Sequence, residues 1–296
     1  MKIFRRFIIV AFLVTCGIYA YYTRMVLGKI DTTAPVISMD SDAIEVSIEA
    51  TNEDLLQGVT AEDDVDGDVS DSLMVESQTM FTSRGTFEIS IVAFDKTGNI
   101  AEVTRQVTYM DYTSPKLEIL EPLRFSENDN SVDILGKVDA TDCIEGDIGS
   151  RIKFVTQEDF WYGNVGEYVL ALQVTNSRGD TEKQEVSFEV LSESDFSDPY
   201  PILSSYLVYT KVGQKIARGK MLIGVQAGNS QYLFEDMEDE ENPRYTSSDV
   251  SIKGDIDFDT PGIYPVVYTY YEKKTVDDEE KKEAKGHCTL YVVVEE

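Results

Sequence analysis

The chain has 296 residues, of which 42% are hydrophobic, and its 55 acidic residues outnumber 26 basic residues to give a net charge of −29. So negative a surface repels nucleic-acid phosphates and anionic lipid headgroups, which argues against nucleic acid as a partner. The charge is compatible with a soluble cell-surface body, with divalent cations or with a basic partner, and also with a solvated acidic face that binds nothing. The length allows two or three domains, and the three cysteines are too few for a disulfide framework.

Residues 1–30 are the first predicted element, a hydrophobic membrane segment. Lys2, Arg5 and Arg6 precede an apolar run over residues 7–22, and this basic flank is expected to stay in the cytoplasm. A helix over residues 4–27, rising about 1.5 Å per residue, reaches across a hydrocarbon core of ~30 Å. The alternatives are an uncleaved single-pass anchor, a cleaved signal peptide and a lipoprotein modified at Cys16. Each of them places residues 31–296 outside the cytoplasmic membrane.

The rest of the chain contains an internal repeat. An acidic block over residues 61–68 returns 79 residues later at residues 140–147, and both copies read A-x-D-x-[V/I]-[D/E]-G-D. A second pair of blocks returns at nearly the same offset, since residues 83–87 and 95–99 correspond to residues 164–168 and 176–180. A repeat of this length predicts tandem copies of one domain.

Each copy begins at a proline-containing linker, residues 31–35 and 111–115, and continues as β-strands. The most regular strand follows a glycine, and apolar residues alternate along it with period two. An aromatic residue two positions after that glycine is similar to the corner that pins one end of an immunoglobulin-like sandwich, the alternative being an ordinary antiparallel hairpin. The residues predicted to point inward are Phe87, Ile89, Ile91 and Ala93 in the first copy, Tyr168, Leu170, Leu172 and Val174 in the second, and Val266, Tyr268 and Tyr270 in a third.

These patterns predict an all-β fold, with three tandem immunoglobulin-like β-sandwich domains preceded by one N-terminal transmembrane or signal helix. The domains are predicted over residues 31–111, 112–192 and 198–296. The third keeps the glycine–aromatic frame at residues 260–264 but lacks the acidic block. The charged stretch over residues 277–285 has no apolar face and is predicted to be an extended, mobile hairpin tip between the last two strands.

The order of these blocks resembles bacterial immunoglobulin-like surface domains of the hyalin-repeat type. The most specific residues are 93–99 (AFDKTGN) and 105–107 (RQV). The first domain matches throughout, the second departs from the family pattern at residues 176–180 (NSRGD), and the third keeps mainly residues 259–264. The resemblance implies β-sandwich spacers and adhesion modules on a bacterial surface, and it implies no defined ligand.

Calcium is the ion that the acidic blocks predict, although no cofactor is required. Ca²⁺ takes about six to eight oxygen ligands, commonly from loops, and one end of a sandwich would hold the acidic block, the turn after the long strand and the entry linker. The alternative is ordinary solvated turns, because Asp and Gly are common turn residues. The predicted ligands are Asp63, Asp66, Asp68 and Asp95 near Asp31 in the first domain, and Asp142, Glu145 and Asp147 together with Asp111 in the second.

Catalysis is not expected, because the sequence contains no nucleophile elbow, zinc-protease or phosphate-loop motif. The single histidine, His287, is followed by Cys288, which lies in the frame that faces a core. Trp161 and the tyrosines could stack on sugar rings, although core packing is the simpler role for them. Tyr271, Tyr291 and Val293 are predicted to alternate outward as a patch that binds a partner.

The predicted function is therefore a non-enzymatic, membrane-anchored ectodomain that serves adhesion or binds an unknown protein or glycan ligand. The first two domains would form a stalk, and the divergent third would carry recognition. The alternative is an accessory or scaffold subunit of an envelope or surface-polymer assembly that docks a basic partner. A stalk stiffened by calcium is a third possibility.

Overall fold

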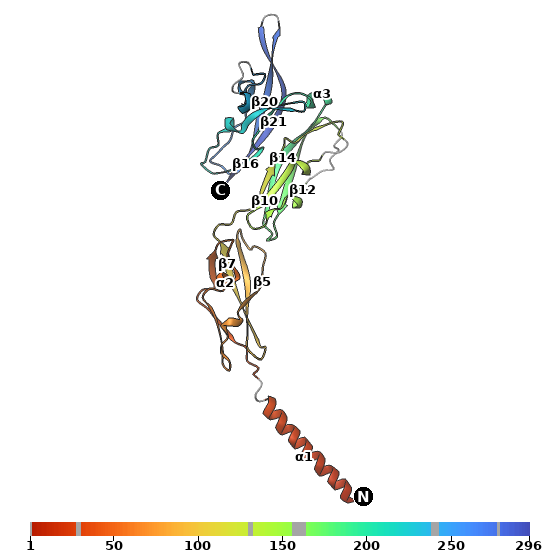
Figure 1. Cartoon of the computed structure of the whole chain (residues 1–296), viewed down its shortest axis with the longest axis vertical. Coiled ribbons are helices and arrows are strands. Elements are labelled where there is room, and N and C mark those ends of the chain that lie inside the picture. The colour runs from red at the N-terminus through yellow and green to blue at the C-terminus, as the bar shows by residue number, and fades with distance from the viewer. Residues whose placement is uncertain (1, 28–30, 130–132, 156–163, 238–242, 277–278) are drawn as a thin grey trace. The chain divides into compact units, whose positions relative to one another are not determined.

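The computed structural model describes residues 2–27, 31–129, 133–155, 164–237, 243–276 and 279–296. The chain forms two compact units, Met1–Tyr112 and Thr113–Glu296. The first unit contains the N-terminal helix and one β-sandwich, and the second contains two further sandwiches (Figure 1). The predicted all-β class with one N-terminal helix is confirmed.

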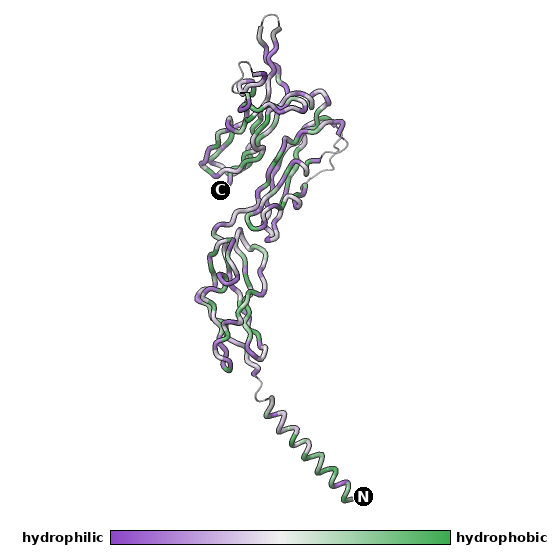
Figure 2. The backbone as a smooth tube through the Cα atoms, viewed as in Figure 1, coloured by the Kyte–Doolittle hydropathy of each residue, from purple (hydrophilic) through white to green (hydrophobic). Residues whose placement is uncertain are grey.

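The N-terminal helix α1 (Lys2–Leu27) is apolar along most of its length. Its span from Ile3 to Met25 has a mean hydropathy of 1.8, and Figure 2 shows the hydrophobic residues densest near the N-terminus. The span has 23 residues, and at about 1.5 Å per residue such a helix exceeds the ~30 Å of a hydrocarbon core. By length and composition α1 can cross a membrane, and a signal sequence has the same properties.

The first sandwich has two sheets. One has the order β1-β3-β4 and the other β2-β7-β6-β5. All the pairs are antiparallel except that of β2 with β7, which is parallel. The strands are β1 (Val36–Met39), β2 (Ala43–Val46), β3 (Val59–Asp63), β4 (Gly67–Asp68), β5 (Met74–Gln78), β6 (Thr86–Phe94) and β7 (Ile100–Tyr109).

The second sandwich repeats this arrangement, with sheets in the order β11-β10-β8 and β12-β13-β14-β9. The parallel pair is now β9 with β14. Its strands are β8 (Lys116–Ile119), β9 (Arg124–Ser126), β10 (Val138–Asp142), β11 (Gly146–Asp147), β12 (Lys153–Val155), β13 (Gly166–Thr175) and β14 (Thr181–Leu191).

The third sandwich has the same order again, β15-β17-β18 and β16-β21-β20-β19, with β16 parallel to β21. One topology is therefore used three times, although the third copy lacks the acidic block. The strands are β15 (Tyr200–Leu203), β16 (Leu207–Lys211), β17 (Leu222–Ala227), β18 (Ser230–Leu233), β19 (Val250–Lys253), β20 (Gly262–Val276) and β21 (Glu279–Glu295).

Short helices occupy some of the connections. In α2, Thr51 and Asp54 form a capping box, in which each side chain accepts a hydrogen bond from the other's backbone N–H. Ser192 caps α3 in the same sense, by accepting from the Asp195 N–H. The short helices are α2 (Asn52–Leu55), α3 (Glu193–Phe196), η1 (Ser70–Ser72), η2 (Leu135–Lys137), η3 (Gly149–Arg151), η4 (Arg218–Met221), η5 (Glu235–Met237) and η6 (Ser247–Asp249).

The face of β6 that is buried in the first sandwich is the one that the alternation of apolar residues predicts. Phe87, Ile89, Ile91 and Ala93 are all buried, because residues two apart on a strand share one face. The equivalent residues Leu170, Leu172 and Val174 on β13, and Val266, Tyr268 and Tyr270 on β20, are buried as well, while Tyr168 is half-buried.

The glycine–aromatic frame forms a tyrosine corner in two of the three sandwiches. The Tyr168 hydroxyl donates to the Asn164 carbonyl at 2.8 Å, and the Tyr264 hydroxyl donates to the Thr260 carbonyl at 2.9 Å. Each bond ties the start of a long strand to the turn four residues earlier, which is the corner known from immunoglobulin-like sandwiches. Phe87 stands at the same position in the first sandwich and has no hydroxyl to donate.

The last two strands extend beyond their sandwich as a two-stranded ribbon (Figure 1). Pairing continues from Tyr271 opposite Ala284 out to Val276 opposite Glu279. Where the chain was predicted to be an extended tip over residues 277–285, residues 279–285 belong to strand β21, and the two residues before them lie outside the described part of the chain.

Candidate functional site

Four carboxylates meet at one end of the first sandwich. One carboxylate oxygen from each of Asp31, Asp63, Asp66 and Asp95 lies within 4.8 Å of one from each of the others. Asp31 lies in the entry linker, Asp63 ends β3, Asp66 lies in the turn before β4, and Asp95 follows β6. The predicted convergence near Asp31 is therefore present for Asp63, Asp66 and Asp95.

Local turn chemistry places these side chains. The Asp63 Oδ1 accepts hydrogen bonds from the Val65 and Asp66 N–H groups at 2.9 and 2.8 Å. This closes an Asx turn, and Gly67 follows it at φ +74°, a left-handed conformation that favours glycine. The block thereby folds back on itself, so that Asp66 lies beside Asp63.

The turn after β6 is organised by Asp95 in the same way. Its Oδ1 accepts from the Thr97 and Asn99 N–H groups at 2.9 and 2.7 Å, and its Oδ2 accepts from the Asn99 amide at 2.6 Å. Burial alone would raise the pKa of Asp95, but the hydrogen bonds from Asn99 and Thr97 outweigh it and lower the pKa. The Asn99 amide also donates to the Asp31 carbonyl at 3.2 Å, which joins the entry linker to this turn.

Within the described residues, two buried oxygens of this cluster have no hydrogen-bond donor, Oδ2 of Asp31 and Oδ2 of Asp63. Asp63 is only 4% exposed, and Asp95 only 8%. Among the described residues Lys96 pairs with this cluster, with its Nζ 3.1 Å from an Asp66 oxygen and its side chain 77% exposed. The described part of the chain therefore compensates only part of the negative charge gathered here, and burial without a partner is costly for a carboxylate.

Two of the predicted ligands lie elsewhere in the first unit. Asp68 accepts from the Ser70 N–H at 2.9 Å, and hydrogen bonds from Ser70 lower its pKa. Asp111 accepts from the Ser47 hydroxyl at 2.7 Å and from the Ile48 N–H at 2.8 Å, which lowers its pKa as well. Asp111 therefore ties the end of the first sandwich to the segment after β2.

In the second sandwich, the carboxylates at the equivalent position accept hydrogen bonds from the chain itself. Asp142 Oδ1 accepts from the Ile144 and Glu145 N–H groups at 2.9 and 3.0 Å, as Asp63 does in the first sandwich. Its Oδ2 accepts from the Asn176 amide at 3.0 Å. Glu145 pairs with Arg151, with Nη1 to Oε1 at 3.1 Å, and this lowers the pKa of Glu145 to about 2. In this sandwich an amide holds Asp142 and a guanidinium holds Glu145, so these two predicted calcium ligands already have partners from the chain.

The remaining predicted ligand of that set, Asp147, accepts from the Gly149 N–H at 2.9 Å. This bond matches the one between Asp68 and Ser70 and marks the start of η3, as the other marks the start of η1. Asp68 and Asp147 therefore shape the exit from the acidic block in their respective sandwiches.

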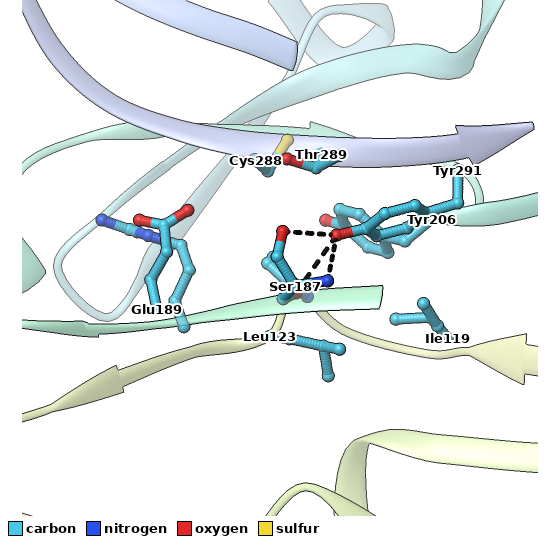
Figure 3. A pocket seen from close by; sticks show the side chains of 10 residues that line it. Ile119, Leu123, Ser187, Glu189, Tyr206, Cys288, Thr289 and Tyr291 are labelled. Carbon is cyan, nitrogen blue, oxygen red and sulfur yellow. Dashed lines mark hydrogen bonds between the residues drawn. The ribbon is translucent and has the colours of Figure 1, made fainter. Parts of the chain in front are cut away.

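The prediction that Tyr291 and Val293 form an exposed patch with Tyr271 is also wrong. Tyr291 is 5% exposed and Val293 7%, while Tyr271 is half-buried where the ribbon leaves the sandwich. The Tyr291 hydroxyl accepts from the Ser187 N–H at 2.7 Å and lies 2.7 Å from the Ser187 hydroxyl (Figure 3). The face of β21 that was expected to meet a partner packs on the second sandwich instead.

The second and third sandwiches share one hydrophobic core, which extends from Leu117 to Val294. A small cavity of about 20 Å³ lies at their junction, lined by Ser187, Glu189, Tyr206, Cys288 and Tyr291 among others (Figure 3). Buried Arg124 stacks over the Tyr200 ring at 4.2 Å on the same junction. Sequence reasoning missed this contact, although the unbroken apolar run at residues 290–294 is a signal of a strand buried on both faces.

His287 forms an ion pair across the junction, with its Nε2 2.8 Å from Glu189 Oε1. The Glu189 carboxylate raises the pKa of His287, and burial and nearby Arg124 only partly offset it. A raised pKa stabilises the fold below the unfolded value of about 6.5, and this contribution is lost as pH rises through the folded value.

We therefore expect the unfolding free energy of Thr113–Glu296 to fall by up to about 1 kcal/mol between pH 6 and pH 9, since the imidazole is partly exposed. Urea unfolding across that range measures the change, and the His287→Gln variant should show a flatter pH profile. An unchanged slope in that variant would assign the pH dependence to another group.

Comparisons with known proteins complete the description of the chain. No protein-family model matches it, so the resemblance to hyalin-repeat domains stays a prediction. An uncharacterized 81.3 kDa protein of Acholeplasma phage L2 is 24% identical over 251 residues, which are 82% of this chain and 31% of the phage protein. The chain thus spans about a third of that relative.

Three solved structures show weak similarity. The Clostridium perfringens ZmpB structure with CBM51-2, GlcNAc and INT domains is 15% identical over 54% of this chain and 42% of that one, with a TM-score of 0.21. The protocadherin GammaB4 extracellular domain is 13% identical (89% and 49% covered, TM-score 0.19), and the human desmocollin-1 ectodomain 11% (89% and 62%, 0.19). None of these similarities assigns the chain to a family or transfers a ligand to it.

Proposed function

We propose that this chain is a membrane-anchored surface protein whose three β-sandwiches form a non-enzymatic ectodomain for adhesion or ligand binding. The observation that carries this proposal is an apolar helix long enough to cross a membrane, with Arg5 and Arg6 near its start, followed by three β-sandwiches. A basic flank favours the cytoplasmic side for the N-terminus, which directs the sandwiches outward. The similarity to a phage protein supports a bacterial or phage setting.

Two residues of types that often serve in catalysis, His287 and Cys288, have structural surroundings in the described chain. His287 is paired with Glu189, and Cys288 is buried, which raises the pKa of its thiol far above neutral pH. A thiol attacks as its thiolate, so Cys288 is a poor nucleophile. These contacts support a structural role for both residues at the junction of the second and third sandwiches.

The third sandwich is the part best suited to recognition. The first two sandwiches end their long hairpin in a turn at Asp95 or Asn176, whereas the third extends the same hairpin as the ribbon of β20 and β21. Lys273 and Lys274 lie opposite Lys282 and Lys281, so like charges face each other across the ribbon. Charged two-stranded ribbons resist adding another strand at their edges. Here Lys273 pairs with Asp249 and Lys274 pairs with Glu283, so the ribbon presents charges of both signs to a ligand.

Protease accessibility tests the proposed topology. The full chain, with an epitope after Glu296, is produced in a bacterial host, and protease is added to intact protoplasts. We expect the epitope to be lost, and the protein before digestion to stay in the membrane after alkaline carbonate extraction. Deleting residues 3–25 should leave it soluble and protected inside. Protection of the epitope in the full chain would refute the proposal.

The same preparation separates the three kinds of N-terminus. The intact mass identifies an uncleaved anchor or a cleaved signal peptide, and incorporation of labelled fatty acid that is lost in Cys16→Ser identifies a lipoprotein. An uncleaved helix and a lipid modification both keep the protein in the membrane, whereas a cleaved signal peptide would release it and would refute the membrane anchor.

A scaffold that docks a basic partner is the second candidate, and the net charge of −29 favours it. Docking that depends on charge should weaken as salt is raised, because the Debye length falls from about 10 Å at 0.1 M to about 3 Å at 1 M. Binding that persists at 1 M salt would favour a specific adhesive contact instead.

A further inference from the structure

We propose that Asp31, Asp63, Asp66 and Asp95 form a Ca²⁺ site that fastens the entry linker to the first sandwich. The inference does not depend on the function proposed above. It rests on the geometry of the four carboxylates, on buried oxygens that lack a donor, and on a comparison with the second sandwich of the same chain.

The spacing of the four oxygens suits one ion. Their mutual distances stay within 4.8 Å, and two ligands on opposite sides of Ca²⁺, each about 2.4 Å from it, are separated by about 4.8 Å. All four ligands are carboxylates, the donor type that Ca²⁺ and Mg²⁺ prefer, whereas zinc sites favour His and Cys. Four charged ligands from three separate segments suit Ca²⁺ better, because Mg²⁺ demands near-ideal octahedral geometry and keeps several waters.

An independent observation points to a missing positive partner. Asp63 is only 4% exposed, and no donor in the described part of the chain reaches its covered Oδ2. The other oxygen, Oδ1, is used by the Val65 and Asp66 N–H groups. Oδ2 of Asp63 is therefore available to bind an ion. Oδ2 of Asp31 is also buried without a donor among the described residues. A buried carboxylate oxygen needs a donor or a cation.

The second sandwich shows what replaces the ion when it is not needed. Asp142 keeps the turn of Asp63, but Asn176 stands where Asp95 stands in the first sandwich. Asn176 Oδ1 accepts from the Arg178 and Asp180 N–H groups at 3.0 and 2.9 Å, so it holds the turn as Asp95 Oδ1 does. Its Nδ2 then donates to Asp142 Oδ2. That bond satisfies the oxygen whose counterpart in the first sandwich, Asp63 Oδ2, has no donor.

A second replacement accompanies it. Arg151, at the end of η3, pairs with Glu145, while the equivalent position at the end of η1 is Ser72, whose hydroxyl donates to the Val69 carbonyl at 2.7 Å. The second sandwich thus directs an amide to Asp142 and a guanidinium to Glu145. In the first sandwich the Asn99 amide donates to Asp95, and the exposed Lys96 pairs with Asp66. The two sandwiches have the same turns, but side chains neutralise or satisfy the carboxylates in the second, and a cation would do so in the first.

Hydrogen–deuterium exchange of the full chain in detergent tests the site, with both sandwiches observed in one sample. Calcium chloride is added at constant ionic strength. We expect slower exchange in peptides that cover residues 61–68 and 94–99, and no change in residues 140–147 and 174–180. If Kd is about 0.1 mM, as in extracellular calcium modules, 10 mM Ca²⁺ slows exchange that requires release of the ion by about 100-fold.

Two variants should lose this response. Asp95→Asn copies the residue that the second sandwich uses at this place, so it should keep the turn and donate to Asp63 Oδ2. Asp63→Asn removes the buried ligand directly. Asp68→Asn is the matched control, because it removes one charge from the same acidic block at a residue that lies outside the cluster. The control should respond to Ca²⁺ like the natural chain.

The outcomes decide the proposal. Protection confined to the first sandwich, lost in Asp95→Asn and Asp63→Asn and kept in Asp68→Asn, supports it, as does an Asp95→Asn chain that melts no lower than the natural chain in chelator. Equal protection at both sandwiches would reveal non-specific screening of an acidic surface and would overturn it. So would no protection at 10 mM Ca²⁺, or an equal response to Mg²⁺.

Discussion

Replacing Phe87 with alanine is expected to destabilise the first sandwich by about 3–5 kcal/mol, the usual cost of removing a buried aromatic ring. Phe87 is fully buried, and its ring lies 5.0 Å from that of Tyr109 and 5.9 Å from that of Phe81. Among the described residues, the main core of this sandwich has six buried members, and such a small core closes only part of a cavity of this size. A loss of this size is a large part of the stability of a small domain.

Pulse proteolysis in urea measures the effect, with fragments of the two compact units distinguished by mass spectrometry. Residues 31–112 should become cleavable at lower urea, while residues 113–296, which have their own core, should keep their midpoint. Val36→Ala is the control, since Val36 lies on a strand of the same sandwich and is mostly exposed. Surface changes usually stay within about 0.5 kcal/mol. Equal midpoints in the two variants would contradict the assignment of Phe87 to the core.

The second large effect is expected at Tyr291, where alanine should cost the unit Thr113–Glu296 about 3–5 kcal/mol. The substitution removes a buried ring from the junction of the second and third sandwiches. It also leaves the Ser187 N–H without the hydroxyl that accepts its hydrogen bond. An unpaired buried donor costs about 1–3 kcal/mol by itself.

Tyr291→Phe separates the two contributions, because it keeps the ring and removes only the hydroxyl. We expect it to cost about 1–3 kcal/mol in urea unfolding, clearly less than alanine. Val169→Ala, at an exposed position on β13, should have little effect. If Tyr291→Ala were as mild as Val169→Ala, the ring would not stabilise the junction and the patch would be available to a partner after all.

The acidic cluster illustrates how far sequence reasoning reaches into a site. Asp63, Asp66 and Asp95 were predicted to meet near Asp31 because repeated loops at one end of a sandwich must lie together. The direction of each side chain was not predictable in the same way. Asp68 follows Asp66 by two residues, but its carboxylate accepts from the Ser70 N–H, and that bond holds it at the start of η1.

The second sandwich shows a different limit. The change from Asp95 to Asn176 is visible in the sequence, but its meaning depends on the amide reaching Asp142 at 3.0 Å. Arg151 lies six residues after Glu145, and η3 brings the two side chains together. A short 3₁₀ turn has no periodicity long enough to read, so the ion pair could not be inferred from spacing.

What the sequence by itself determined is the local structure and its repetition. Alternation with period two placed Phe87, Ile89 and Ile91 in a core, the glycine–aromatic frame predicted the corners at Tyr168 and Tyr264, and the apolar run predicted α1. These features depend on residues close together in the chain.

Only the tertiary structure decided which strand faces meet water. Tyr291 and Val293 alternate correctly with their neighbours, but their side of β21 is buried by the second sandwich, because a strand's pattern records two faces and does not record what covers each one. For the acidic block, the sequence predicted which carboxylates meet in the first sandwich. The tertiary structure decided their partners: an amide and a guanidinium bind Asp142 and Glu145 in the second sandwich, whereas buried oxygens of Asp31 and Asp63 have no donor among the described residues.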